Sequence, residues 1–167
     1  MTENPIVADS SPLIALSIIQ QLDLLPKLYR RVVIPQTVWE EITVYGAGLP
    51  GAVAISQIDW LIIEKPAPEW LKPLSILLDP GEAEAIALAM NLPESTVLID
   101  DAQARRVAER FGVNRVGTLG LLRRGKNAGL IDAIKPYTVR LKSSGIYIRQ
   151  SLIDAVLRDV GEFNHLK

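Results

Sequence analysis

The stretch Thr96-Val97-Leu98-Ile99-Asp100-Asp101-Ala102-Gln103-Ala104-Arg105 decides the fold class of this chain. Its apolar, β-favouring start predicts a buried strand, and the pattern after the two acids predicts a helix. In open α/β sheets, ligands bind beyond the carboxyl ends of the strands. Two adjacent carboxylates at that edge repel each other and are costly to bury unless a cation or hydrogen bonds compensate. The stretch therefore indicates a cation site, and the simpler alternative is that one aspartate caps the helix.

The composition of the whole chain is that of one globular domain. The chain has 167 residues, a formal net charge of -1 and no cysteine, and 49% of its residues are hydrophobic but only 5% aromatic. We therefore expect a single domain over residues 1–167 with an aliphatic core. The absence of cysteine excludes disulfides and thiolate metal sites, and the single histidine, His165, makes a histidine base improbable. We expect a cytoplasmic protein with no membrane span.

Strands and helices alternate along the chain, which predicts a mainly parallel, doubly wound α/β sheet. The expected strands number about five: 6–8, 32–34, 60–63, 96–99 and 113–116. Helices are expected between them, and the segment with Pro66, Pro68 and Pro73 is expected to be an irregular connection. In such a topology the carboxyl ends of all strands lie at one edge of the sheet.

Further acids are expected near that edge. Asp9 follows the first strand directly, as Asp100 and Asp101 follow the fourth. Glu41 lies beside the apolar face of the helix predicted over 37–45, although an ordinary boundary acid is the simpler interpretation. Glu82 and Glu84 open an otherwise apolar helix, about 200° apart around its axis. Acids in a first turn are favoured by the helix dipole alone, which explains Glu82 better than Glu84.

A cluster of carboxylates without histidine or cysteine is the ligand set of a hard divalent cation such as Mg²⁺ or Mn²⁺. Such ions usually bind substrate phosphates as well, as in metal-dependent nucleases. A local basic excess agrees with a phosphate-bearing substrate, because residues 102–126 contain seven basic residues and one acid, Glu109. Solvated helix faces are the alternative explanation for these charges.

The last part of the chain is expected to extend the core fold, which spans about 6–128. Over residues 129–167 the pattern predicts a helix interrupted by Pro136, a strand-like run at 146–148 and a helix at 152–160. The last helix has an apolar stripe formed by Leu152, Ile153, Val156 and Val160. That stripe either covers the chain's own core or contributes to a homodimer contact.

Four blocks in order resemble PIN domains, more narrowly a prokaryotic PIN-like branch related to toxin ribonucleases. They are Asp9-Ser10-Ser11-Pro12-Leu13-Ile14, Ile34-Pro35-Gln36-Thr37-Val38-Trp39-Glu40-Glu41-Ile42, Gly81-Glu82-Ala83-Glu84-Ala85-Ile86-Ala87-Leu88-Ala89 and Leu98-Ile99-Asp100-Asp101-Ala102-Gln103-Ala104-Arg105. The resemblance implies a three-layer α/β/α fold with acids that bind Mg²⁺ or Mn²⁺. It also implies metal-dependent cleavage of single-stranded RNA, a small antitoxin partner encoded nearby, and a homodimer.

Position by position, the resemblance implies that the first acid is Asp9 and the second Glu41. The third is Glu82 or Glu84, and the fourth is Asp101 or Asp100, because this sequence departs from the commoner PIN toxins at both places. Weaker candidates for contacts to RNA phosphates or for support of the site are Ser10, Arg105, Arg106, Thr118 and Lys126.

Two other functions compete with a nuclease. A response-regulator receiver domain also combines acids with a parallel sheet, but its acid pair would follow the first strand rather than the fourth. A degenerate PIN fold that binds nucleic acid or protein without catalysis is the stronger alternative. Cleavage of RNA with Mn²⁺, abolished by Asp9→Asn, separates the enzyme from such a binding module.

Overall fold

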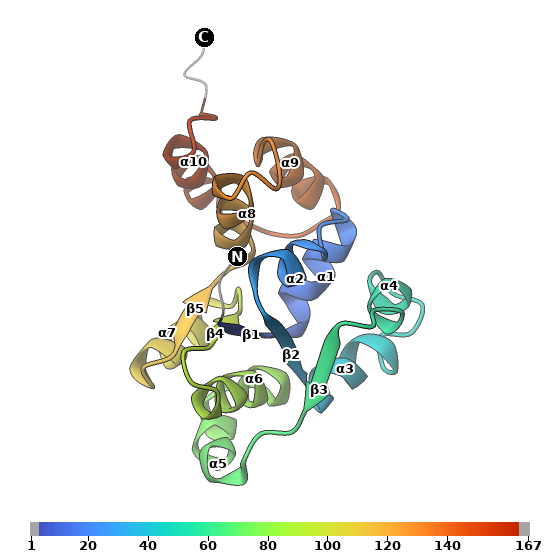
Figure 1. Ribbon diagram of the computed structural model, residues 1–167, viewed down its shortest axis with the longest axis vertical. Helices are drawn as coiled ribbons and strands as arrows, with labels where there is room; N and C mark the ends of the chain where they lie inside the picture. The colour runs from blue at the N-terminus through green and yellow to red at the C-terminus, as the bar shows by residue number, and fades with distance from the viewer. Residues whose placement is uncertain (1–3, 164–167) are drawn as a thin grey trace.

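The computed structural model describes residues 4–163, and a five-stranded parallel sheet lies at its centre (Figure 1). The sheet has the order β3-β2-β1-β4-β5, and every neighbouring pair is parallel. The strands are β1 (Pro5–Ala8), β2 (Arg31–Pro35), β3 (Leu61–Glu64), β4 (Thr96–Leu98) and β5 (Asn114–Val116). This arrangement confirms the predicted α/β class and the parallel sheet. His165 lies outside the described residues.

Each face of the sheet is covered by its own hydrophobic core, since successive side chains of a strand point to opposite faces. In β1, Ile6 and Ala8 belong to one core and Val7 to the other. The first core includes residues from α1 (Ser10–Ile18), α2 (Leu24–Leu28), α3 (Gln36–Thr43), α4 (Ala52–Ser56), α8 (Thr118–Asn127), α9 (Lys135–Ser143) and α10 (Gln150–Asp159). The second includes residues from α5 (Pro68–Leu77), α6 (Pro80–Asn91) and α7 (Ala102–Arg110). The three-layer α/β/α prediction is confirmed.

Two local predictions are wrong. The proline-punctuated connection after β3 contains helix α5, in which Pro68 occupies the first position and Pro73 lies inside. Proline is well tolerated in a first turn, where the backbone N–H has no helical partner. The strand-like run at 146–148 forms no strand, although Ile146 and Ile148 pack against the first core. Residues 146–148 are held by hydrophobic packing, and they have no neighbouring strand among the described residues with which to form backbone hydrogen bonds.

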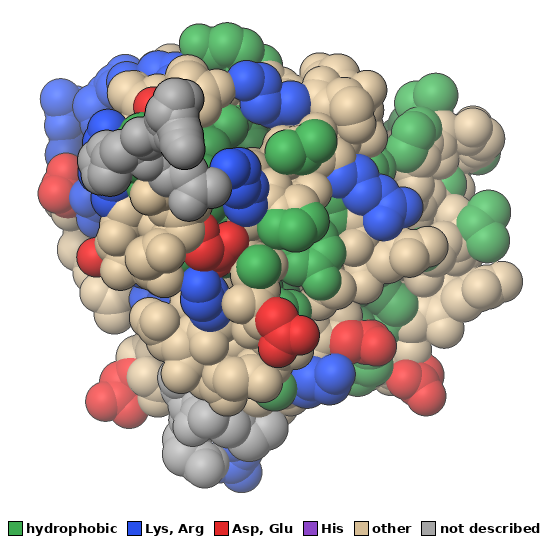
Figure 2. Space-filling model, turned by 90° about the horizontal axis from the view of Figure 1, so that it is seen from above, with side chains coloured by type: hydrophobic (Ala, Val, Ile, Leu, Met, Phe, Trp, Pro, Cys, Tyr) green, Lys and Arg blue, Asp and Glu red, His purple; other side chains and the backbone are tan. Residues whose placement is uncertain are grey.

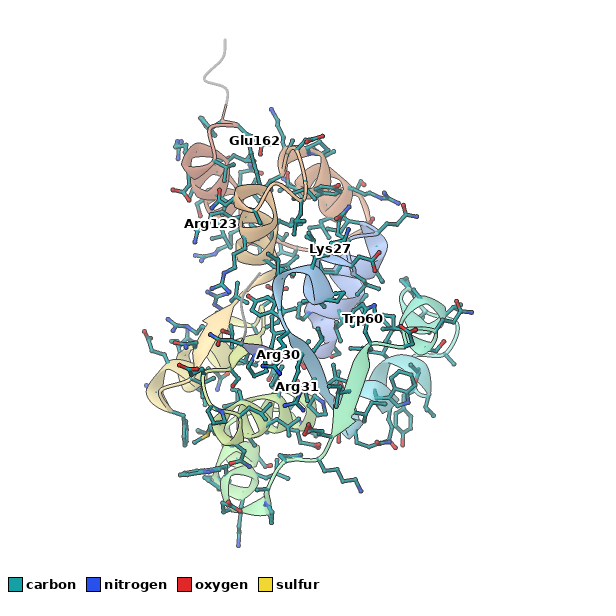
Figure 3. All side chains as sticks on the ribbon, viewed as in Figure 1. Lys27, Arg30, Arg31, Trp60, Arg123 and Glu162 are labelled. Carbon is teal, nitrogen blue, oxygen red and sulfur yellow. The ribbon has the colours of Figure 1, made fainter. Side chains whose placement is uncertain are left out.

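Glu162 fastens the end of the described chain to α8 and α9. Its carboxylate accepts hydrogen bonds from Lys126 Nζ at 2.8 Å, from the Ile134 N–H at 2.8 Å and from the Lys135 N–H at 2.9 Å. Figure 3 labels Glu162 between α9 and α10, the helices that form the top of Figure 1. These contacts hold the three last helices together above α1 and α2. None of the helices in the described part of the chain is long and apolar enough to span a bilayer.

Candidate metal centre

Asp9 lies at the carboxyl end of the central strand and is almost fully buried, with 5% of its surface exposed. Its backbone N–H donates to Leu98 O at 3.0 Å, which continues the pairing of β1 with β4. Burial raises the pKa of the Asp9 carboxyl from 3.8 to about 7, and the charges of Glu82, Asp79 and Glu41 raise it further, against a hydrogen bond from the Ser10 N–H. Asp9 is therefore a buried acid among other acids.

Glu82 approaches the same region from the first turn of α6. Its pKa is raised to about 7, chiefly by burial and then by the charges of Asp79 and Asp101. Asp79 is the N-cap of α6, where its Oδ1 accepts the Glu82 N–H at 2.9 Å. Asp79 is not among the site residues predicted from the sequence. An aspartate before a proline at the first helical position is a common helix start. The pair Asp79-Pro80 could therefore have identified Asp79 as the residue that begins the helix carrying Glu82.

Glu41 reaches the start of α6 from α3. Its carboxylate accepts a hydrogen bond from Ser10 Oγ at 3.1 Å. A Cβ atom on Gly81 would lie only 2.6 Å from Glu41 Oε1, so glycine is required there for the close approach of this carboxylate. Burial raises the pKa of Glu41, as do the charges of Asp79 and Glu84, whereas the Ser10 hydrogen bond lowers it.

Glu84 faces α3 from a different side of α6. The Thr37 hydroxyl donates a short hydrogen bond to its carboxylate. Its charge raises the pKa of Glu41, whereas the charge of Glu82 raises the pKa of Asp9. The two glutamates thus point to different members of the same group of acids, as their separation around the helix axis requires.

Asp100 and Asp101 have different surroundings. Both oxygens of Asp100 accept hydrogen bonds from Thr118, one from the backbone N–H at 2.7 Å and one from Oγ1 at 2.6 Å. Asp101 caps α7 by accepting the Ala104 N–H at 2.9 Å, and its charge raises the pKa of Glu82. Asp101 therefore belongs electrostatically with the other acids, and Asp100 holds the start of α8.

We call the residues Asp9, Glu41, Asp79, Glu82, Glu84 and Asp101 the acid cluster. Its donor atoms are all carboxylate oxygens, the ligands that Mg²⁺ and Mn²⁺ prefer, and the pKa values of buried Asp9 and half-buried Glu82 are raised. The cluster fits a divalent cation in its chemistry. In their present orientations, however, no three acids within residues 4–163 lie close enough together to hold one ion. Glu41 and Glu84 instead accept hydrogen bonds from Ser10 and Thr37.

Most of the basic and hydroxyl candidates already have partners in the protein. Ser10 donates to Glu41, Thr118 to Asp100, and Lys126 to Glu162. Arg106 is exposed on α7, and Arg105 is half-buried near the ends of β4 and β5. The structure therefore does not gather these five residues into one basic surface.

A shallow polar cavity lies at the opposite edge of the sheet. It is lined by the end of α6 and by the segments before β4 and β5, including Met90, Ser95 and Phe111. These segments precede the strands, whereas Asp9, Asp100 and Asp101 follow them. The cavity is separate from the acid cluster, and it gathers no comparable group of acids.

Comparison with known proteins agrees with the geometry. A family model described as PIN domain matches residues 5–162. No curated protein matches the chain. PIN domains are generally nucleases and usually use divalent metals, so the match indicates a nuclease-type fold. Since the match spans both cores of the sheet and the three last helices, this chain belongs to the PIN domain family.

Proposed function

We propose that this protein is a divalent-metal-dependent endoribonuclease that cleaves single-stranded RNA. The observation that carries the proposal is the pair formed by Asp9 and Glu82, whose pKa values are both raised to about 7 at the carboxyl edge of the sheet. Two such groups ionise together at neutral pH at a high electrostatic cost, which a divalent cation removes. Membership of a family of nucleases supports the same conclusion.

The residues proposed to hold Mg²⁺ or Mn²⁺ are Asp9, Glu41, Glu82 and Asp101. Glu82 is preferred to Glu84 because its charge raises the pKa of Asp9, whereas that of Glu84 raises the pKa of Glu41. Asp101 is preferred to Asp100 because its charge raises the pKa of Glu82, whereas both oxygens of Asp100 accept hydrogen bonds from Thr118. A bound divalent ion lowers the pKa of water and stabilises negative charge on phosphate oxygens. Within the chain, Ser10 orients the Glu41 carboxylate, and Asp79 fixes the first turn of α6 that carries Glu82.

Cleavage of a labelled single-stranded RNA by the purified chain tests the proposal. We expect cleavage with Mn²⁺, none with EDTA, and a loss of at least about 100-fold on Asp9→Asn, because such ions supply several kcal/mol of charge stabilisation. Asp132→Asn, at an exposed acid outside the cluster, is the matched control and should cleave normally. Equal activity of Asp9→Asn and the parent chain would reject the assignment.

We further propose that the enzyme acts as the toxin of a toxin–antitoxin pair. Expression of the chain alone should then arrest growth, expression of the Asp9→Asn variant should not, and co-expression of the neighbouring open reading frame should restore growth. If cells that express an active ribonuclease grow normally, the toxin role is rejected and the proposed ribonuclease activity is not.

The second candidate function is a PIN fold that binds RNA or protein without cleaving. The orientation of the acids favours it, since no three described carboxylates gather around one point. Binding of RNA that is equal with Mn²⁺ and with EDTA, without any cleavage product, would support this binding module over the enzyme.

A further inference from the structure

Arg105 lies beside the acid cluster, one turn along α7 from Asp101, and its N–H donates to Asp101 O at 2.9 Å. Its guanidinium lies against Gly117, the residue between β5 and α8. A Cβ atom at Gly117 would be 2.5 Å from Arg105 Nη1 and 2.9 Å from Asp100 Oδ1. The Arg105 guanidinium and the Asp100 carboxylate thus both occupy the space that a side chain at position 117 would fill.

The glycine at position 117 leaves space for these side chains and is not needed for backbone conformation. Its φ is −98°, which any residue adopts readily. The contacts that exclude a Cβ atom are the end of the Arg105 side chain and the Asp100 carboxylate. Gly117 is therefore the feature that lets the guanidinium lie close to the ends of β4 and β5.

The Asp100 carboxylate lies near this guanidinium, but the two groups form no ion pair. Both of its oxygens already accept hydrogen bonds from Thr118, and Arg105 forms no ion pair among the described residues. Within residues 4–163 its guanidinium donates to Ile99 O, at a long 3.5 Å. A half-buried guanidinium that forms no ion pair among the described residues keeps N–H donors for an external anion.

Four of the six other cations of the basic excess have partners in the protein, and the remaining two, Arg106 and Arg110, are exposed on α7. Arg115 pairs with Glu109, Arg123 with Asp159 and Lys126 with Glu162. Arg124 donates to the Tyr29 hydroxyl and lies over its ring. Arg105 differs from these residues because its guanidinium is held against Ile99 and Gly117, at the carboxyl edge of the sheet. It is therefore the strongest candidate for a contact to substrate.

We propose that Arg105 binds a phosphate of the single-stranded RNA backbone next to the acid cluster. Asp100 and Thr118 act as positioning residues for this contact and do not bind a metal. This inference rests on the proposed function, since it names the contact that the RNA substrate makes at that site. A guanidinium matches the geometry of phosphate oxygens in a way that a lysine ammonium does not.

The test uses the full chain without metal, in EDTA, and a fluorescein-labelled single-stranded RNA of mixed sequence. The dissociation constant is measured by fluorescence anisotropy over a range of NaCl concentrations. Each phosphate contact contributes about 0.7 to the slope of log affinity against log salt for single strands. We expect Arg105→Gln to reduce the magnitude of this slope by about that amount. Arg110→Gln, at an exposed residue at the other end of α7, should leave it unchanged.

Gly117→Ala is the second variant, because it displaces the guanidinium and keeps its charge. It should reduce the slope as Arg105→Gln does, and thermal melting of each variant confirms that it is folded. A merely structural role of Arg105 would change the melting temperature without changing the salt slope. If Gly117→Ala does not fold, the salt slope of Arg105→Gln alone decides whether Arg105 contacts a phosphate.

The outcomes separate this inference from the proposed function. The contact is overturned if Arg105→Gln leaves the salt slope unchanged, or if Arg110→Gln reduces the salt slope equally. Cleavage by the parent chain would then still support the ribonuclease. A lower slope without any cleavage supports the contact in a binding module. If the parent chain binds no RNA in EDTA, the contact is rejected, and cleavage with Mn²⁺ still decides the ribonuclease.

Discussion

At the level of single residues, Asp9 determines how the protein responds to pH. A carboxyl whose pKa is higher in the folded protein binds its proton more tightly when folded, so the free energy of unfolding falls as pH rises between the two pKa values. For Asp9 this interval runs from 3.8 to about 7, and for Glu82 from 4.5 to about 7. The protein without metal should therefore lose stability between acid and neutral pH.

Asp9→Asn should raise the stability of the metal-free protein near pH 8 and leave it nearly unchanged near pH 4. The amide cannot ionise, so the variant avoids an electrostatic cost of up to about 4 kcal/mol at the higher pH. Urea unfolding at both pH values measures the difference, with Asp132→Asn as the control. Marked destabilisation near pH 8 would instead assign Asp9 a structural role at the end of β1.

Mn²⁺ should raise the melting temperature, and the increase should be larger near pH 8 than near pH 5. A cation binds the ionised carboxylates of the folded state and competes with their protons. Differential scanning fluorimetry at saturating Mn²⁺ measures the shift, which Asp9→Asn should reduce. An unchanged midpoint near pH 8 would show that the cluster does not bind this metal in the free protein.

The positions of Asp9 and Asp101 could be read from the sequence, since each follows an apolar strand. The surroundings of Asp79 and Asp100 could not be read in the same way. Asp79 looks like a turn residue until α6 is in place, and Asp100 reaches Thr118, which follows a different strand. Contacts between separate elements depend on register and rotation, which no local pattern contains.

At the level of elements, the start of α6 depends on the space above Gly81. Alanine in a helix is ordinarily more stable than glycine by up to about 1 kcal/mol. We expect Gly81→Ala to lower the free energy of unfolding instead, because its Cβ atom would displace the Glu41 carboxylate. In a Glu41→Ala background the same substitution should become stabilising. Urea unfolding of the parent chain, the two single variants and the double variant gives the coupling energy between Gly81 and Glu41. If Gly81→Ala changes the stability in the same direction in both backgrounds, the proposed packing is contradicted.

The contact between Glu162 and α9 should stabilise the last helices. Partial burial raises the pKa of Glu162, but hydrogen bonds from Lys126, Lys135 and Ile134 outweigh this effect and lower it. Its contribution is therefore complete above about pH 4.5 and is lost as pH falls below that value. Glu162→Gln should cost about 1–3 kcal/mol at neutral pH, and less in acid.

Glu109→Gln is the control for this measurement, since the partner of Glu109 is Arg115 in a surface pair. Such pairs contribute about 0–1 kcal/mol. Equal unfolding midpoints for the two variants would mean that the Glu162 contacts do not stabilise the tail.

Hydrophobic patterning predicted the strands and most helices, and it failed where a partner decides the structure. Helix α5 was missed because three prolines suggest a connection, yet Leu74 of this helix is fully buried in the second core. The run at 146–148 has strand-like residues but no neighbouring backbone to pair with. Tertiary packing overrode local preference at both places.

At the level of the whole molecule, the apolar stripe of α10 is used inside the chain. Ile153 and Leu157 are buried in the first core, and Val156 and Val160 pack against it. The described tail keeps exposed apolar side chains at Val139, Leu152 and Tyr147, the last with 84% of its surface exposed. On the face seen from above in Figure 2, hydrophobic side chains are interspersed with charges of both signs.

A homodimer stays a prediction, and the exposed residues of the tail are its proposed contact. Sedimentation velocity of the full chain at micromolar concentration should give a dimer, and the double substitution Leu152→Ser with Tyr147→Ser should give a monomer. Leu49→Ser, at an exposed residue before α4, is the control. A monomeric parent chain would exclude the dimer, and a dimeric double variant would place the contact elsewhere.

The strand order has a consequence for the time at which the protein matures during its synthesis. The central strand β1 is made before β4, yet Val7 of β1 pairs with Val97 of β4. Contacts between distant parts of a chain form late and slowly. Asp9 therefore cannot meet Glu82 and Asp101 until the segment that carries them has left the ribosome. Under the ribonuclease function proposed above, the nascent chain should therefore not cleave RNA while its acids are still apart.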